Sequence, residues 1–327
     1  MKAAWYSALG PATAVLQYGD MPKPNIGADD VLVELTFSGA NPSDVKARGG
    51  ARPGVTKPQF DRIIPHSDGS GIITEVGSNI SPARLGQKVW IWNGQWQRPF
   101  GTAAEFIALP SEQAVEMPQE MSFETGATLG IPGLTAAHCC FAHGSLKQKT
   151  VLISGGAGAV GNLAIQLAKW DGAFVIATAS AHNQDRVSKA GADVVLAYDD
   201  PDLAEQILHH APNGIDYAIE VEFGTNAPLL AEVMKPNSYI MTYGSALDMA
   251  PTFPFGPFLF KALKIDIALI YILDLAQRYK AIECLHSAHA QGALMSDIHG
   301  VFDLSEIALA HQTIEAGKRS GAILLKP

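Results

Sequence analysis

The sequence predicts an α/β protein in which a doubly wound parallel sheet is joined to a smaller β-rich domain. Three observations carry this prediction. Apolar strands alternate with helical segments in the second part of the chain, a glycine-rich loop lies between the first of these strands and its helix, and the preceding residues form short strands broken by Gly and Pro. Such alternation is typical of a parallel sheet covered by helices on both faces. At 327 residues the chain is long enough for two domains that each bury a core.

The first part of the chain indicates a compact β-rich unit. Its strands are expected at 31–39, 71–77 and 88–92, separated by Gly and Pro. An Ala-rich helix at 274–294 and the tail 321–327 are expected to return to this unit. We therefore predict one domain over 1–122 and 272–327, and a second domain over 123–271.

The second part of the chain alternates strands with helices. Strands are expected at 150–155, 173–180, 193–198, 215–221 and 238–245. Helices are expected at 159–170, 183–191, 202–211 and 227–235. This order contains no internal repeat, and it predicts parallel strands joined by helical crossovers.

Composition and charge argue against several classes of protein. The net charge is −9 and no basic cluster occurs, so neither nucleic acid nor an anionic membrane is expected as a partner. The most apolar run, 267–273, is far too short to span a bilayer. Three cysteines, of which Cys139 and Cys140 are adjacent, argue against a disulfide framework. The N-terminus lacks the apolar core of a signal peptide, and we expect a cytoplasmic protein.

The strongest local signal is a G-x-G-x-x-G loop that follows an apolar strand and opens an amphipathic helix. Its members are Gly156, Ala157, Gly158, Ala159, Val160 and Gly161. The first Gly permits the tight turn, the second lets the backbone approach a pyrophosphate, and the third lets the helix pack on the strand. The helix N-terminus then offers N–H groups to the phosphates. The loop therefore predicts a Rossmann-type dinucleotide site, although a purely structural turn has the same composition.

The end of the second strand of this domain predicts which dinucleotide is bound. An NAD-selective site needs an Asp or Glu there, about twenty residues beyond the glycines. The sequence has Thr178-Ala179-Ser180, and the first acid is Asp185. A carboxylate would repel a 2′-phosphate, whereas Ser180 and Arg186 could accept one, so the pattern predicts NADPH. Ser180 would equally suit a helix N-cap.

Five motifs occur in an order shared with a known family. They are SGANPSDVKARGG, IPHSDGSGIITEVG, GTAAEF, IPGLTAAH and SGGAGAVG. With these motifs the chain resembles, over essentially its whole length, the medium-chain dehydrogenase/reductase superfamily. Within it the chain is similar to the zinc-free quinone oxidoreductase, or zeta-crystallin-like, branch. The resemblance implies a GroES-like catalytic domain beside the Rossmann-type domain, and a homodimer.

The segment IPHSDGSG, residues 64–71, combines residues that could hold a metal or a nucleophile. Zinc members of the superfamily bind a catalytic zinc through Cys, His and Cys, and the resemblance places Asn41, Ser67 and Ile131 at those positions. Amide, hydroxyl and alkyl groups are poor zinc ligands beside thiolate and imidazole. His66 is one residue out of register with the lost His. We therefore predict that no metal is bound and that this segment is a glycine-bearing turn.

The resemblance also implies which residues contact the coenzyme. Asn41 would contact the nicotinamide ribose and could reach the substrate, although an Asn before Pro42 also suits a turn. The remaining implied contacts are Thr135, Tyr198, Gly244 and Ser245. Asn183 replaces a lysine that is usual in the family, which weakens the expected preference for NADPH.

An aromatic wall is expected for the substrate. The residues assigned to it are Trp92, Arg98, Phe255 and Phe258. A flat apolar molecule suits such a wall, and core or dimer packing would explain the same rings equally well. Cys139 and His143 lie four residues apart on one helical face, but two ligands do not make a metal site, and a packed helix is the favoured interpretation.

These observations predict an NADPH-dependent, zinc-independent reductase. Its partner would be a small apolar quinone or α,β-unsaturated carbonyl compound, which takes hydride at carbon while its oxygen becomes an enolate. The protein must then supply position and hydrogen-bond donors near that oxygen, and Asn41, Arg98 or water could do so. Two alternatives stay open: a non-catalytic, crystallin-like NADPH-binding protein, and a zinc alcohol dehydrogenase, which the missing ligands oppose. The sequence does not decide between quinone and enone.

Overall fold

The computed structural model describes residues 1–51, 54–317 and 319–327, and the chain divides into two units. The first unit comprises Met1–Ile131 and Ser296–Pro327, and the second comprises Pro132–Met295. The expected division at 122 and 272 differs from this one chiefly in helix α10 (Leu275–Ala290). That helix packs against α4 (Leu134–Phe141), and both helices belong to the second unit.

The second unit is built on a six-stranded sheet in which every pairing is parallel. Its strands are β8 (Thr150–Ile153), β9 (Phe174–Ala179), β10 (Val194–Ala197), β11 (Ile215–Glu220), β12 (Met234–Thr242) and β13 (Lys264–Ile267). Their spatial order is β10-β9-β8-β11-β12-β13. This is the strand order 3-2-1-4-5-6 of the Rossmann fold. Successive strands are added on one side of β8 and then, from β11 onward, on its other side. The predicted parallel sheet is confirmed.

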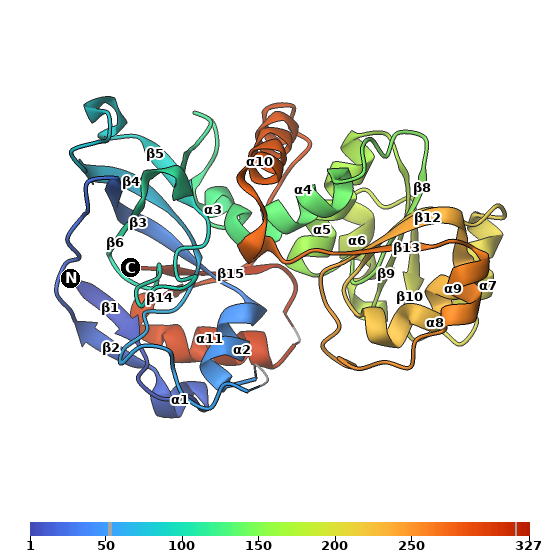
Figure 1. Cartoon of the computed structure of the whole chain (residues 1–327), viewed down its shortest axis with the longest axis horizontal. Coiled ribbons are helices and arrows are strands. Elements are labelled where there is room, and N and C mark those ends of the chain that lie inside the picture. Colours follow the sequence, from blue (N-terminus) through green and yellow to red (C-terminus); the bar gives the residue numbers. More distant parts are fainter. Residues whose placement is uncertain (52–53, 318) are drawn as a thin grey trace. The chain divides into compact units, whose positions relative to one another are not determined.

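Helices connect the strands of this sheet and cover it (Figure 1). They are α5 (Ala159–Trp170), α6 (Gln184–Lys189), α7 (Leu203–His210), α8 (Phe223–Val233) and α9 (Phe255–Phe260). Buried apolar side chains from the strands, α7, α8 and α9 form one core cluster, which includes Leu152, Ile207, Leu230 and Ile240. Because consecutive parallel strands all point the same way, their carboxyl ends share one edge of the sheet.

The first unit is largely β-structure. Its strands are β1 (Lys2–Trp5), β2 (Gln17–Asp20), β3 (Asp30–Ala40), β4 (Asp68–Val76), β5 (Lys88–Ile91), β6 (Phe106–Pro110), β7 (Ala114–Glu116), β14 (Ile298–Asp303) and β15 (Ala322–Lys326). β1 pairs with β2. The others form a sheet of order β14-β15-β3-β4-β5-β7, in which β6 also pairs with β3. The C-terminal strand β15 thus pairs within the sheet of this unit.

Among the residues that the structure describes, four α-helices complete the first unit. They are α1 (Ala12–Val15), α2 (Pro42–Gly49), α3 (Phe123–Gly126) and α11 (Ile307–Glu315). The antiparallel register of β3 and β4 pairs Gly39 with Asp68. Asn41 follows the last residue of β3 and precedes α2, so this register brings Asn41 beside Asp68. A Cβ atom on Gly39 would lie 2.2 Å from the carbonyl oxygen of Ala127, so only Gly allows the close approach of α3 to β3 at this point.

Candidate active site

The glycine loop lies at the carboxyl end of β8, beside the point where the strand order reverses. A Cβ atom on Gly161 would lie 2.3 Å from the Gly155 carbonyl oxygen, so the third glycine of the motif is required for α5 to pack on the turn. Gly158 differs, because a Cβ atom there would meet only the same oxygen, at 3.3 Å. The chain itself therefore leaves space at Gly158, and this space suits the close approach of a pyrophosphate.

The N-terminus of α5 is open to an anion. Its N-cap residue is Gly158, no side chain among the described residues caps it, and its first turn contains no acidic residue. The N–H groups of the first turn therefore keep the partial positive charge of a helix N-terminus. Ala157, Ala159 and Val160 belong to this turn and loop, which fits the predicted phosphate contact.

The carboxyl end of β9 presents donors and no carboxylate. Asn183 donates to Ser180 Oγ at 3.0 Å, and a ring nitrogen of His182 lies 3.4 Å from the same oxygen. Arg186 lies half-buried on α6. The N–H of Tyr198, just beyond β10, donates to the Ala179 carbonyl at 3.2 Å, which places Tyr198 beside this strand end with 59% of its surface exposed. Sequence reasoning did not single out His182, whose neighbours along the chain offered no signal.

Two acidic side chains at the end of β11 hold neighbouring segments by hydrogen bonds. Buried Glu220 accepts hydrogen bonds from Ser154 Oγ at 2.7 Å and from the Asn226 amide at 3.0 Å. Burial raises the pKa of Glu220, which these hydrogen bonds partly offset. Half-buried Glu222 accepts hydrogen bonds from the backbone N–H groups of Ala246 and Leu247. The turn after β12 is thereby held against the turn after β11.

Gly244 and Ser245 lie in this tied turn. A Cβ atom on Gly244 would lie 2.5 Å from the Val221 carbonyl oxygen, so the close approach of the two strand ends requires glycine. Ser245 Oγ accepts the N–H of Gly224 at 2.8 Å. Thr135 lies in the first turn of α4 and is buried. Glycine loop, Ser180, Tyr198 and Gly244 thus belong to strand ends along one edge of the parallel sheet.

In the first unit, Asn41 and Asp68 form a buried polar pair. The Asn41 side-chain nitrogen donates to Asp68 Oδ2 at 2.8 Å, and the Asn41 backbone N–H donates to Asp44 Oδ2 at 2.8 Å. All three residues are at most 6% exposed. Burial raises the pKa of Asp68 well above its usual value, and the nearby Asp44 carboxylate raises it further. Sequence reasoning missed Asp68, because its partner is 27 residues away.

The residues at the zinc-ligand positions do not fit a metal. Asn41 gives one amide hydrogen to Asp68, and the Ser67 hydroxyl accepts the N–H of Gln95 at 3.4 Å. Ile131 contributes only an alkyl side chain. Over residues 1–51, 54–317 and 319–327, no three His, Cys, Asp or Glu side chains gather as a metal site. An amide, a hydroxyl and an alkyl group lack the donor chemistry that holds zinc.

His66 is turned into the interior of the first unit. Its ring contacts Ser38 and His311, and none of its surface is exposed. The pair Cys139 and His143 is likewise part of a packed helix region. Burial raises the pKa of the Cys139 thiol to about 12, and His143 contacts Asp266 at 3.1 Å while its ring stacks on Tyr239.

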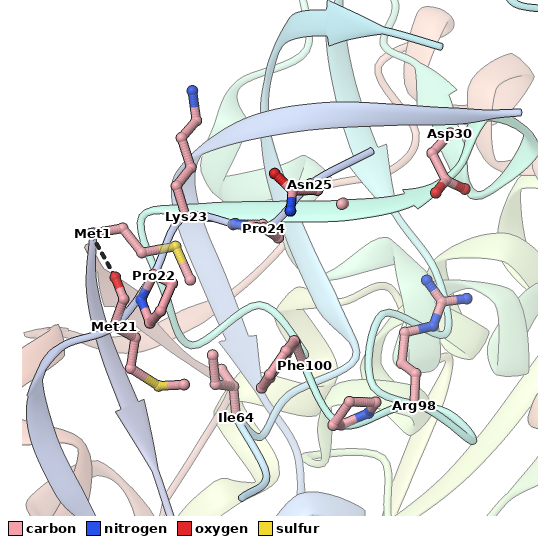
Figure 2. A pocket seen from close by; sticks show the side chains of 12 residues that line it. Met1, Met21, Pro22, Lys23, Pro24, Asn25, Asp30, Ile64, Arg98 and Phe100 are labelled. Atoms are coloured by element: carbon pink, nitrogen blue, oxygen red, sulfur yellow. Dashed lines mark hydrogen bonds between the residues drawn. The ribbon is translucent and has the colours of Figure 1, made fainter. Parts of the chain in front are cut away.

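The predicted substrate wall is only partly supported by placement. Arg98 lines a cavity of about 420 Å³ in the first unit, together with Met1, Met21 and Phe100 (Figure 2). Asn41 does not line this cavity, so Arg98 and Asn41 do not face a common space there. Burial lowers the pKa of Arg98, while Asp30 opposes that effect.

The aromatic members of this wall are placed differently from one another. Trp92 is 4% exposed and lies directly after β5. In the second unit, Phe255 is 63% exposed at the start of α9, whereas Phe258 is 4% exposed within the core. Phe258 packs against Phe253 with ring centres 4.7 Å apart. Phe258 thus makes its contacts in the core of the second unit.

Comparison with known proteins bears on both units. The family described as alcohol dehydrogenase GroES-like domain matches residues 27–119, and the family described as zinc-binding dehydrogenase matches residues 159–286. A chloroplast envelope quinone oxidoreductase homolog of Arabidopsis thaliana is 29% identical over 336 aligned residues, covering 100% of this chain and 98% of the relative. A chloroplastic quinone-oxidoreductase homolog of Spinacia oleracea is 29% identical over 341 residues, with the same coverage.

Solved structures share the fold along the whole chain. A mycobacterial protein complexed with NADPH matches with a TM-score of 0.88 and 23% identity, covering 100% of both chains. An NAD-dependent alcohol dehydrogenase matches at 0.89 and 24%, again over 100% of both chains. The CurK enoyl reductase matches at 0.85 and 23%, covering 99% of this chain and 98% of the other. In the part of this chain that the structure describes, no helix is long and apolar enough to cross a membrane.

One family match falls within each unit, and the quinone oxidoreductase relatives align from end to end. The chain is thus an oxidoreductase of the medium-chain dehydrogenase/reductase type. It belongs to the zinc-free quinone oxidoreductase branch of that superfamily.

Proposed function

We propose that this protein transfers hydride from NADPH to quinones or α,β-unsaturated carbonyl compounds without a metal. The observation that carries the proposal is the buried Asn41–Asp68 pair, 2.8 Å between amide nitrogen and carboxyl oxygen. Asn41 occupies a position at which zinc relatives are expected to have a thiolate ligand, and its side-chain amide already donates a hydrogen bond to Asp68. Such a site orients molecules by hydrogen bonds and does not polarise an unactivated carbonyl as a Lewis acid does.

The coenzyme would lie along the carboxyl edge of the parallel sheet. The N–H groups at the start of α5 would take the pyrophosphate, and Tyr198 would lie near the adenosine end. Ser180, His182 and Asn183 form a cluster of polar groups at the end of β9. Because no carboxylate stands there, a 2′-phosphate would meet no like charge, and this supports NADPH over NADH.

The bound coenzyme supplies the hydride, and this chain's own residues supply position. Asn41 would meet the nicotinamide ribose or the substrate oxygen with the part of its amide that is not used by Asp68. Thr135, at the start of α4, and the tied turn of Gly244 and Ser245 would bound the nicotinamide end. A conjugated acceptor needs little further help, because hydride addition at carbon places charge on an oxygen that an amide N–H or water can solvate.

The test is anaerobic oxidation of NADPH against quinones, enones, simple ketones and aldehydes. We expect turnover with conjugated acceptors and almost none with unactivated ones. Deuteride at C4 of NADPH should appear on the β-carbon of an enone product. Tight NADPH binding without turnover of any acceptor would favour the non-catalytic alternative, and brisk acetaldehyde reduction alone would contradict the proposal.

We also propose a homodimer formed through β13. This edge strand pairs with β12 on one side, and no strand of the described residues pairs with its other side. Exposed apolar side chains lie on it and near it, including Ile267 at 75% exposure and Phe260 at 89%. A free edge with apolar neighbours favours pairing with a second copy. Light scattering should report a dimer, and Ile267→Lys should weaken it. A monomer at micromolar concentration would contradict this assignment.

We further propose that the protein works in the cytoplasm. Cys139, Cys140 and Cys284 are free thiols, and disulfides are rare in reducing compartments. A fluorescent fusion observed in the native host tests this placement, and retention in an organelle would overturn it.

A further inference from the structure

A line of hydrogen bonds joins the C-terminal helix α11 to the start of β4. The Nε2 atoms of His311 and His66 are 2.9 Å apart, and His66 Nδ1 lies 2.8 Å from Ser38 Oγ. Ser38 Oγ lies 2.9 Å from Thr102 Oγ1, which donates to the backbone carbonyl of Asp68. None of the four side chains in this line has any exposed surface. Water therefore does not compete for these contacts.

The direction of each proton in the line follows from its last member. A carbonyl oxygen only accepts, so the Thr102 hydroxyl hydrogen points to Asp68. Thr102 Oγ1 must then accept from Ser38, and Ser38 Oγ must accept from His66 Nδ1. A neutral His66 therefore carries its proton on Nδ1 and accepts at Nε2. His311 must in turn donate from Nε2.

The surroundings keep both rings neutral. The ring centres are 5.2 Å apart with planes at 24°, so the imidazoles meet edge to edge through their nitrogens. Burial lowers the pKa of His66, and burial together with the Arg48 cation lowers the pKa of His311 to about 3. Arg48 itself is paired with Glu315 of α11 and donates to the Gly10 carbonyl.

These hydrogen bonds also hold His66 in an unfavourable backbone conformation. His66 has a φ of 75°, in the left-handed region that residues other than Gly rarely adopt. Contacts at both ring nitrogens fix the His66 side chain in this conformation. Two residues later, the Asp68 backbone accepts the end of the line while its carboxyl group holds Asn41.

We propose that His311 and His66 are positioning residues of the active site: their proton-ordered line fixes the start of β4, so that Asp68 holds the Asn41 amide in one orientation. Neither imidazole is assigned a contact with substrate or coenzyme. The effect on turnover rests on the proposed function, whereas the tautomers and the orientation of Asn41 do not. Helix α11, near the C-terminus of the sequence, thereby acts on Asn41, which lies between β3 and α2.

The first experiment reads the tautomers directly. Two-bond 1H–15N correlation spectra of 15N-histidine-labelled full-length protein at neutral pH should show His66 protonated on Nδ1 and His311 protonated on Nε2. The Nδ1–H form is the less common tautomer of histidine in water, so its presence at His66 is diagnostic. A spectrum with His66 protonated on Nε2, or with either ring cationic at neutral pH, would overturn the proposal whether or not the protein reduces quinones.

The second experiment compares two substitutions of His311. Gln carries an N–H donor near the position of Nε2, so His311→Gln should keep the line, whereas His311→Leu leaves His66 Nε2 without a donor. We expect His311→Leu to lower kcat roughly tenfold with the Kd for NADPH changed less than twofold, and His311→Gln to restore most of the rate. The side-chain amide signals of Asn41 should shift in the Leu variant and return in the Gln variant.

His209 provides a matched control. It is exposed on α7, so His209→Leu and His209→Gln should leave both kcat and the Asn41 signals unchanged. Equal effects of Leu and Gln at position 311 would indicate general packing and would overturn the positioning role. If no acceptor is reduced by the parent protein, the proposed function fails, and the Asn41 signals and the tautomers still decide this inference.

Discussion

The side-chain amide of Asn41 donates to the carboxyl group of Asp68 across 2.8 Å, and both side chains are buried. The pairing of β3 with β4 produces this contact, because the residues flanking the two strand ends are held opposite each other. A buried carboxyl group without a cation partner is stabilised in its neutral form. The pairing of β3 with β4 therefore sets both the orientation of the Asn41 amide and the protonation of the Asp68 carboxyl group.

Asp68→Asn should preserve the fold and remove one contribution to the pH dependence of stability. Because the folded-state pKa of Asp68 is raised, its contribution to stability is present below the unfolded pKa and is lost as pH rises through the folded value. The variant lacks this titration. Urea unfolding should therefore show Asp68→Asn gaining stability relative to the parent as pH rises from 4 to 8, a range that starts near the ordinary Asp pKa of about 3.9 and extends roughly four units above it. A constant difference across this range would contradict a raised pKa.

Gly158→Val should abolish coenzyme binding while the protein stays folded. The branched side chain would fill the space that the backbone leaves for a pyrophosphate, and it would meet little of the protein itself. Gly161→Ala is the matched control, since its Cβ atom would lie 2.3 Å from a backbone oxygen and should cost roughly 2 kcal/mol of stability. Isothermal titration with NADPH and thermal unfolding separate the two outcomes. Unchanged NADPH affinity in Gly158→Val would show that the loop is only a structural turn.

Ser180→Asp should shift the coenzyme preference toward NADH. A carboxylate at the end of β9 would repel a 2′-phosphate and could accept from the ribose hydroxyls. We expect NADPH affinity to fall by about tenfold or more, equivalent to about 1.4 kcal/mol, with NADH affinity unchanged or improved. Competitive titration of both coenzymes gives the ratio. Equal NADH and NADPH affinity in the parent protein would already contradict the assignment of this strand end.

Acid should destabilise the first unit through the histidine pair. Both His66 and His311 have lowered pKa values in the folded state, so the unfolded chain binds more protons below its pKa of about 6.5. The contribution of the two neutral histidines to the free energy of unfolding is therefore fully present above that value. It is lost as pH falls toward 3, by up to about 1.4 kcal/mol per pH unit for each group. The cation that acts on His311 is Arg48, which is paired with Glu315. His311→Gln should reduce the slope measured by urea unfolding between pH 7 and pH 5, and an unaltered slope would contradict neutral, buried rings.

Removal of metal should leave activity unchanged. The amide of Asn41 and the hydroxyl of Ser67 are already engaged within the protein and lack the donor chemistry of zinc ligands. Purified protein should therefore contain well under one zinc per chain, and dialysis against a chelator should not reduce NADPH oxidation. Elemental analysis with about one zinc per chain, together with loss of activity on chelation, would show that the donor set has been misjudged.

The sequence alone determined the features that depend on neighbours along the chain. A glycine loop between an apolar strand and an amphipathic helix can be recognised within about a dozen residues. The alternation of strand and helix periods predicts the parallel sheet of the second unit. The missing acid at Ala179–Ser180 is also a local fact, readable from its distance to the glycines. The absence of thiolates at positions 41 and 67 needed only the residue types.

Tertiary structure alone decided the contacts between distant segments. Asn41 meets Asp68 only through the register of two strands, and His66 meets His311 across 245 residues of sequence. Phe258 enters a core and α10 joins the second unit because of partners that no local period reveals. Local propensity acts over a few residues. The contacts between distant segments, in contrast, pair buried polar groups and bury apolar surface across the whole folded chain, so they form only once the strands have paired.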